Sequence, residues 1–183
     1  MLRIQPITKH LKNSHIIKGI YNSTFPKFQQ IPVRFLLHKT KNEAVKFNAY
    51  YDEDLLVGFS YTITYDDLTY VLYLASNPDF HSKGYGSQIL ACIKEQYPNN
   101  RIILNLEGQD EKAKNSEQRK KRKNFYLKNG YAPAGMSLKF INGLTADVLI
   151  INGTCTVAEF RALFKRYLGI FWLPILGPRI KQL

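Results

Sequence analysis

A mixed α/β fold is the class that the sequence predicts, and three observations point to it. Apolar, strand-like runs alternate with segments of helical periodicity along most of the 183 residues. Residues 44–51 and 55–65 are joined by the turn signal Asp52-Glu53-Asp54, as expected of antiparallel neighbours. The apolar run 70–76 precedes a glycine loop and a helical pattern, which indicates a βαβ-like centre.

Each expected element follows from its local pattern. Strands are predicted where residues alternate or stay apolar between turn signals, at 2–7, 44–51, 55–65, 70–76, 101–106, 136–141 and 146–151. Helices are predicted where apolar residues recur every three or four positions, at 9–21, 33–38, 88–97, 116–128 and 156–167. The result is about six to seven strands and four to five helices in the order β-α-α-β-β-β-α-β-α-β-β-α.

Local chemistry predicts several of the element ends. Gly130 is the expected left-handed residue after the helix 116–128, because glycine adopts positive φ without a Cβ penalty. Thr154 or Thr156 is expected to cap the last helix through its hydroxyl. Asn142-Gly143 indicates a hairpin between the last two strands.

The charge of the chain favours anionic partners. The formal net charge is +12, and hydrophobic residues make up 45% of the chain, which argues against disorder. Five of the cations form the block 119–123. This block has two interpretations, a solvated helix face or a surface that binds nucleic acid or the ribosome. Since no nucleic-acid-binding motif is recognisable, a nucleic-acid partner is the less favoured interpretation.

The two ends of the chain and its cysteines predict where the protein is located and how many domains it has. Residues 1–6 lack the apolar core of a signal peptide, and no run of 18 apolar residues exists, so we expect a cytoplasmic protein without a membrane span. Cys92 and Cys155 are expected as free thiols. We expect one domain over residues 1–168 and an apolar, basic tail over 169–183, which either packs on the domain or contacts a partner or lipid surface.

The segment 80–87, Phe-His-Ser-Lys-Gly-Tyr-Gly-Ser, predicts a phosphate site. It joins an apolar strand to a helix, and a helix N-terminus offers unpaired N–H groups and the positive end of the helix dipole. The two glycines allow close approach of the backbone to an anion. An ordinary glycine-containing turn is the alternative for this loop taken alone.

A second motif gives the loop a family context. His81-Ser82-Lys83-Gly84-Tyr85-Gly86 resembles the Gln/Arg-x-x-Gly-x-Gly/Ala signature of the GNAT superfamily, the acetyl-CoA-dependent N-acetyltransferases. The segment 124–131, Asn-Phe-Tyr-Leu-Lys-Asn-Gly-Tyr, resembles the Phe-Tyr-x-x-x-Gly-Phe segment of that family. With the order of the expected elements, the resemblance to the family spans about residues 2–167. The stretch 117–126 resembles an uncharacterised bacterial subgroup of it.

The resemblance implies acetyl-CoA as cosubstrate and no metal. The pyrophosphate would meet the loop, and the pantetheine arm would pair with the strand backbone; the residues implied are Leu74, Ser76, His81, Ser82, Lys83, Gly84, Tyr85, Gly86 and Ser87. His81 departs from the family's Gln or Arg and adds no charge when neutral. Arg119 stands where many members have Asn, and we expect it to meet a CoA phosphate or an acidic acceptor.

The same resemblance implies direct acetyl transfer to a primary amine. Tyr126 matches the tyrosine that protonates the departing thiolate. The strand 70–76 has no carboxylate for the general base, so Glu107 is the nearest candidate, with a water chain as the alternative. A non-catalytic CoA-binding module on the same fold is the competing hypothesis. The acceptor is open among small amines, amino acids, antibiotics and proteins, and a homodimer is left open.

Overall fold

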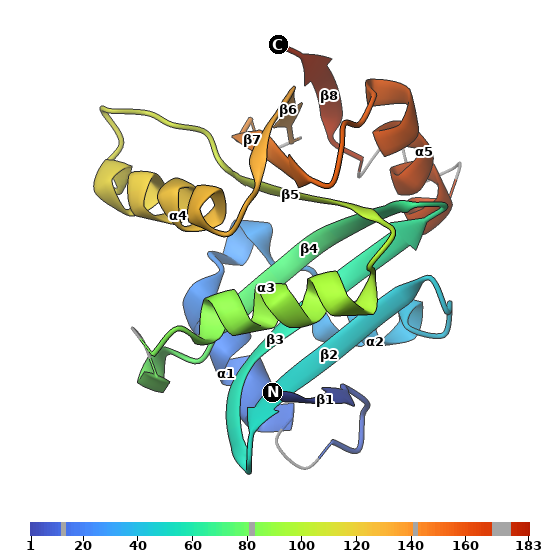
Figure 1. Cartoon of the computed structure of the whole chain (residues 1–183), viewed down its shortest axis with the longest axis vertical. Helices are drawn as coiled ribbons and strands as arrows, with labels where there is room; N and C mark the ends of the chain where they lie inside the picture. The colour runs from blue at the N-terminus through green and yellow to red at the C-terminus, as the bar shows by residue number, and fades with distance from the viewer. Residues whose placement is uncertain (12–13, 81–82, 141–142, 170–176) are drawn as a thin grey trace. The chain divides into compact units, whose positions relative to one another are not determined.

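The computed structural model describes residues 1–11, 14–80, 83–140, 143–169 and 177–183. It divides into two compact units, residues 1–63 with 71–98, and residues 64–70 with 99–183 (Figure 1). Strand β4 (Leu68–Ser76) contributes residues to both units. The expected boundary between a domain ending at residue 168 and a tail stays a prediction.

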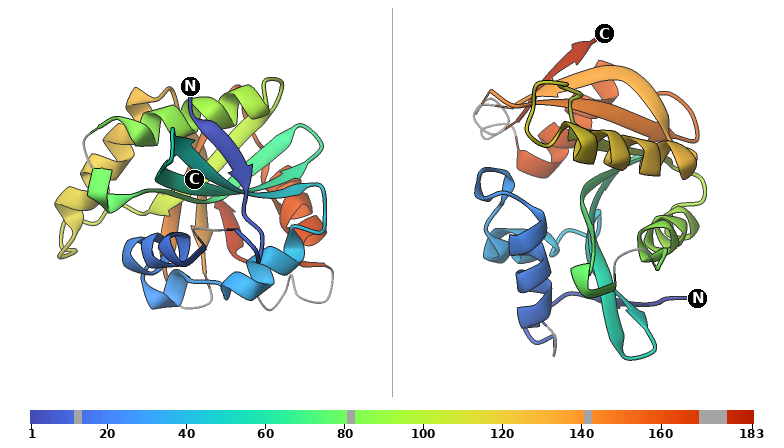
Figure 2. Two further views of the ribbon diagram at one scale, coloured as in Figure 1. Left: turned by 90° about the horizontal axis from the view of Figure 1, so that it is seen from below. Right: turned by 90° about the vertical axis from the view of Figure 1, so that its left-hand side faces the viewer.

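The first unit is an antiparallel sheet with helices on both faces. Its strands are β1 (Arg3–Pro6), β2 (Val45–Asp52), β3 (Leu55–Tyr65) and β4, in the order β1-β2-β3-β4. Its helices are α1 (Ser14–Thr24), α2 (Val33–Lys39) and α3 (Tyr85–Gln96), with short 3₁₀ turns η1 (Lys27–Gln29) and η2 (Pro78–Phe80). Figure 2 shows α1 and α2 on one face of these strands and α3 on the other.

Close packing fixes α3 against the strands of the first unit. A Cβ added to Gly58 on β3 would lie 2.4 Å from the carbonyl oxygen of Ala75 and 2.6 Å from Cδ1 of Ile89 on α3. Glycine is therefore required where helix and strands approach most closely. The other face is filled by aromatic rings, among which Tyr21, Phe25 and Tyr73 meet with centroids 4.8–5.5 Å apart.

The second unit continues from the first residues of β4. Its strands are β5 (Arg101–Glu107), β6 (Ala132–Lys139), β7 (Thr145–Ile151) and β8 (Arg179–Gln182), in the order β5-β7-β6-β8. Its helices are α4 (Ser116–Lys128) and α5 (Val157–Leu168). β7 pairs antiparallel with β5 and with β6, and β6 pairs antiparallel with β8.

The described helices of the second unit, α4 and α5, lie on opposite faces of its strands. Lys123 on α4 contacts Asp147 on β7, while Phe160 and Phe164 on α5 contact the ring of Tyr70 on β4. Tyr70 donates a hydrogen bond to Asn105, whose register partner on β7 is residue 148. Adjacent residues of a strand point to opposite faces of the sheet. Residue 147 therefore lies on the face that α4 contacts, and residue 148 lies on the face that α5 contacts.

The mixed α/β prediction is confirmed, and the described residues form eight strands, in place of six to seven, and five helices. The additional strand β8 was expected to be part of a tail. β6 begins at Ala132 rather than 136, because an irregularity between Pro133 and Ser137 hides the alternating pattern. Gly130 has a φ of 88° and Thr156 forms a capping box with Glu159, as local chemistry predicts.

Candidate functional site

The described part of the glycine loop forms an uncapped helix start. Gly84 is the N-cap of α3 with a φ of 78°, and no side chain caps the helix within the part of the chain that the structure describes. The N–H of Lys83 donates to Phe80 and that of Ser87 to Gly84, so these two donors are used inside the chain. The N–H groups of Gly84, Tyr85 and Gly86 donate to no described residue, which narrows the expected anion donors to these three.

Open space and the positive charge of one lysine lie at this helix start. A Cβ at Gly84 would have no described neighbour within 4 Å, and Lys83 is exposed with its ammonium 5.3 Å from the centre of the Phe80 ring. The Tyr85 hydroxyl donates to Asp52 at 2.7 Å, which turns that phenol toward β2. The hydrogen bond to Asp52 raises the pKa of Tyr85. His81 and Ser82, also expected here, lie outside the described residues.

β4 presents its backbone beside half-buried side chains at the two expected positions. Leu74 and Ser76 are both half-buried, and they alternate with the buried Tyr73 and Ala75. The Tyr73 hydroxyl donates to the carbonyl of Gln29 at 2.6 Å and accepts from the N–H of Ile31 at 3.2 Å. It therefore anchors the connection between α1 and α2. Because its hydroxyl is engaged in these contacts, we do not assign Tyr73 as the general base on β4.

Tyr126 is buried near the end of α4. Its ring lies 5.1 Å from the ring of Phe125 and 5.9 Å from that of Tyr131. Burial raises the pKa of Tyr126, and the positive charge of Arg122, one turn earlier on the helix, lowers it in part. The phenol therefore stays protonated at neutral pH and has a cation nearby, which suits a proton donor to an anion.

Glu107 and Arg119 are brought together, although the sequence assigned them separate tasks. Nε of Arg119 lies 3.4 Å from Oε2 of Glu107, and both side chains are largely buried, at 19% and 18% exposure. Arg119 also donates through Nη1 to the carbonyl of Gly108 at 2.7 Å and through Nε to Asn115 at 2.8 Å. Nη2 is the part of the guanidinium that is left for the expected contact with a CoA phosphate.

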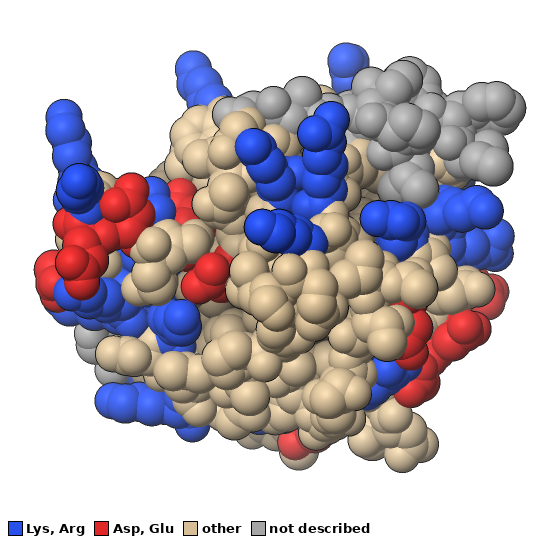
Figure 3. Space-filling model, turned by 90° about the horizontal axis from the view of Figure 1, so that it is seen from above, with Lys and Arg blue, Asp and Glu red and all other residues tan. Residues whose placement is uncertain are grey.

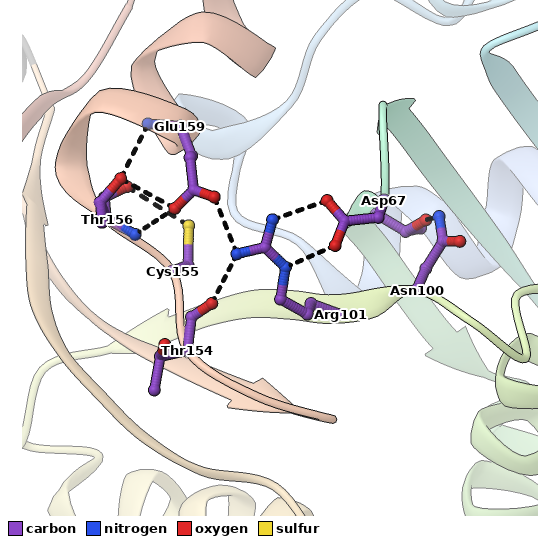
Figure 4. A network of polar contacts seen from close by, with 8 residues as sticks. Asp67, Asn100, Arg101, Thr154, Cys155, Thr156 and Glu159 are labelled. Atoms are coloured by element: carbon purple, nitrogen blue, oxygen red, sulfur yellow. Dashed lines mark hydrogen bonds and ion pairs between the residues drawn. The ribbon is translucent and has the colours of Figure 1, made fainter.

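A second ion-pair network was not predicted. Arg101 at the start of β5 makes two hydrogen bonds to Asp67, at 2.6 and 3.0 Å, and an ion pair with Glu159 at 2.9 Å (Figure 4). Glu159 in turn accepts from the N–H and hydroxyl of Thr156. The neighbouring Cys155 is buried, which raises the pKa of its thiol to about 11. This network ties the turn before β4 to the start of α5 and serves stability rather than nucleophilic chemistry.

Sequence comparison decides the family. The profile of the acetyltransferase (GNAT) domain matches residues 43–133, which contain the glycine loop, Glu107 and Tyr126. The chain belongs to the GNAT acetyltransferases. It is an acyltransferase, as the resemblance of its two motifs predicted. No curated protein shows significant sequence similarity to this GNAT chain.

Solved structures share the GNAT fold at low sequence identity. An acetyltransferase assigned to the GNAT family of Bacteroides thetaiotaomicron is 22% identical, with a TM-score of 0.70 over 97% of this chain and 99% of that one. An aminoglycoside 6'-N-acetyltransferase complexed with coenzyme A is 16% identical, with a TM-score of 0.64 over 81% and 96%. The ribosomal-protein-S18-alanine N-acetyltransferase from Escherichia coli is 13% identical, with a TM-score of 0.61 over 85% and 96%.

The structure thus groups the site residues of this GNAT protein into two sets. The first unit holds the described loop residues 83–87 with Leu74 and Ser76, and the second holds Tyr126, Glu107 and Arg119. Sequence reasoning missed Asn115, which donates to Glu107 at 3.0 Å and accepts from Arg119. Its position directly before α4, where a capping asparagine is common, was the available signal. Among the described residues, no helix has the length and apolar character of a membrane span.

Proposed function

We propose that this GNAT protein transfers the acetyl group of acetyl-CoA directly to a primary amine. The observation that carries the proposal is the uncapped start of α3, with open space at Gly84 and an exposed Lys83, inside the segment that matches the GNAT domain. A helix start of this kind is a binding site for phosphate. A CoA-bound relative with the same fold supports CoA as its source.

In the proposed cofactor site, backbone groups do most of the binding. The N–H groups of Gly84, Tyr85 and Gly86 donate to the pyrophosphate, and the Lys83 ammonium and Ser87 hydroxyl add contacts. His81 and Ser82 belong to the same proposed loop. The backbone of Leu74 and Ser76 pairs with the pantetheine amides. Because the backbone supplies these bonds, apolar side chains on β4 are compatible with the role.

Tyr126 is the proposed general acid. The neutral amine attacks the thioester carbon, a C–N bond forms, and the C–S bond breaks with its electron pair leaving on sulfur. The phenol donates its proton to that sulfur, and the proton released from the amine nitrogen goes to a base or to water. The raised pKa keeps the phenol protonated before the step, and the positive charge of Arg122 stabilises the phenolate that follows.

Glu107 is the proposed base, and its contacts indicate how the proton of the amine would reach it. The carboxylate accepts from Asn115 and lies against the guanidinium of Arg119. A water chain from the amine to Glu107 is the form of proton transfer that this arrangement supports, since contacts to Asn115 and Arg119 already occupy Oε2.

From the relatives we infer that the acceptor is an amine, and we infer no narrower class of acceptor. One relative is an N-acetyltransferase of an aminoglycoside and another of a ribosomal protein, so the shared fold accommodates very different acceptors. The competing hypothesis is a CoA-binding module without catalysis. Its support is that the described strand β4 contains no carboxylate, and that the hydroxyls of Tyr70 and Tyr73 are engaged in hydrogen bonds.

Calorimetric titration with acetyl-CoA tests the proposal. We expect micromolar binding to the full chain, weakened about three- to tenfold in Lys83→Gln, because one charge-assisted contact to phosphate is removed. Lys41→Gln, which removes an exposed lysine outside the site, is the matched control and should bind like the wild type. No heat of binding at millimolar acetyl-CoA would contradict the proposal.

A further inference from the structure

The positive charge of the chain is concentrated toward its C-terminal part. Residues 119–183 contain twelve lysines and arginines but two acidic residues, Asp147 and Glu159. Both acidic side chains are already engaged, Asp147 with Lys123 at 3.3 Å and Glu159 with Arg101 at 2.9 Å. The cations that follow residue 123 therefore have no carboxylate of their own region to neutralise them.

The block 119–123 does not hold most of the positive charge that lacks a carboxylate partner. Within the block 119–123, Arg119 contacts Glu107, Lys120 contacts Glu117 at 3.5 Å, and Lys123 contacts Asp147. Three of its five cations are thus paired with carboxylates. The interpretation of this block as a nucleic-acid surface loses support, because three of its five cations already have carboxylate partners in the chain.

Strand pairing gathers other cations that are far apart in the sequence. In the register of β6 and β8, Lys139 lies opposite Arg179, and Ser137 lies opposite Lys181. On the next strand, Thr145 pairs with Lys139 and Asp147 with Ser137, so these side chains share one face of the sheet. This is the face of Asp147, opposite to the one that α5 covers. We call Lys139, Arg179 and Lys181 the basic face.

The basic face is exposed and unbalanced. All three cations are exposed, and none has a carboxylate within ion-pair distance among the residues that the structure describes. Like charges placed directly opposite each other destabilise a strand pair. Figure 3 looks onto the side where β8 and the C-terminus lie, and it shows lysine and arginine side chains near its middle and at both sides, with most of the acidic ones toward the sides.

We propose that the basic face binds the sugar–phosphate backbone of a nucleic acid. Three unneutralised cations on a sheet face offer contacts to successive phosphates, and counterion release favours such binding. The two rows also contain Ser137 and Thr145, whose hydroxyls donate to phosphate oxygens, and Asp147, whose charge is paired with Lys123. No apolar side chain belongs to these two rows, whereas a membrane-docking surface combines cations with apolar groups that enter the lipid.

The test measures binding of a fluorescent single-stranded RNA of about 20 nucleotides to the full chain at several salt concentrations. The triple variant Lys139→Gln, Arg179→Gln, Lys181→Gln should bind at least about tenfold more weakly at ~0.1 M salt. The slope of log K against log[salt] should become less negative by about 2, since each lost phosphate contact contributes about 0.7. The single variant Lys181→Gln should change the slope by about 0.7 and covers the case that the triple variant does not fold.

The control removes the same charge elsewhere. Lys9→Gln, Lys18→Gln, Lys41→Gln takes three exposed lysines from the first unit and should leave the RNA affinity within about twofold. An equal loss in this control, or no binding of RNA by the wild type, would overturn the proposal. Displacement of the RNA by millimolar CoA would reassign the surface to the cofactor. A variant that keeps RNA binding but loses binding to phosphatidylserine vesicles would reassign it to a membrane.

Discussion

Arg119 joins Glu107 at the end of β5 to the first turns of α4. The guanidinium lies 3.4 Å from the carboxylate and donates to the carbonyl of Gly108, so it closes the loop between strand and helix. Since Tyr126 lies two turns further along the same helix, this contact also sets the position of the proposed general acid. The residue that the sequence assigned to a CoA phosphate thus has a defined task inside the protein.

Replacing Arg119 by lysine should lower the free energy of unfolding by about 1–3 kcal/mol. Lysine keeps the charge but cannot make both hydrogen bonds of the planar guanidinium. Urea denaturation measures the change, and Lys121→Gln, an exposed cation of the same helix, should cost less than about 0.5 kcal/mol. Unchanged stability would refute the closing role. An additional loss of acetyl-CoA affinity in Arg119→Lys would assign Nη2 to the cofactor as well.

The Arg101 network should make stability depend on pH in the acid range. Hydrogen bonds from the backbone and hydroxyl of Thr156, with the charge of Arg101, lower the pKa of Glu159 from 4.5 to about 2. The folded pKa is the lower one, so the stabilisation is complete above about pH 4.5 and is lost as the pH falls toward 2. Glu159→Gln should flatten the fall of the unfolding free energy across this window, as measured by urea denaturation at each pH.

Glu117 provides the control for this pH dependence. Its side chain is 78% exposed and 3.5 Å from Lys120, a surface pair of small energetic value. Glu117→Gln should therefore retain the wild-type pH profile. Parallel profiles for Glu159→Gln and the wild type would show that the network does not lower the pKa of this carboxyl.

Two glycines should respond to the same substitution in opposite directions. Gly58→Ala places a methyl group 2.4 Å from a backbone oxygen and should destabilise by about 1–3 kcal/mol, because strand and helix must move apart. Gly19→Ala on α1 meets no atom within 4 Å and should stabilise by about 0.5–1 kcal/mol through helix propensity. Thermal denaturation of both variants checks this. A stable Gly58→Ala protein would contradict the close packing of α3 on β3 and β4.

Local chemistry predicted some of the element ends, and tertiary pairing decided others. Gly130 and Thr156 could be assigned because a left-handed C-terminal residue and a capping hydroxyl are local requirements. β8 could not, since Arg179–Gln182 is short and mostly polar, and it becomes a strand only by pairing with β6. The start of β6 was hidden by Pro133 and Gly135, which interrupt the alternation.

The site was predicted unevenly for the same reason. The glycine loop and Tyr126 belong to compact motifs whose spacing is visible in the sequence. The contact of Glu107 with Arg119 spans a polar loop without periodicity, so no pattern indicates it. The basic face depends on the register of β6 and β8, which places residues 139 and 179 side by side although 40 positions separate them in the chain.

Steady-state kinetics of Tyr126→Phe with an identified amine acceptor tests the central claim most directly. The account predicts a loss of kcat of about 10²- to 10⁴-fold with acetyl-CoA affinity kept within about threefold, because the phenol acts on the leaving thiolate alone. Tyr131→Phe removes a hydroxyl from the neighbouring ring, 5.9 Å away, and should keep kcat within about threefold. Unchanged kcat in Tyr126→Phe would contradict the account.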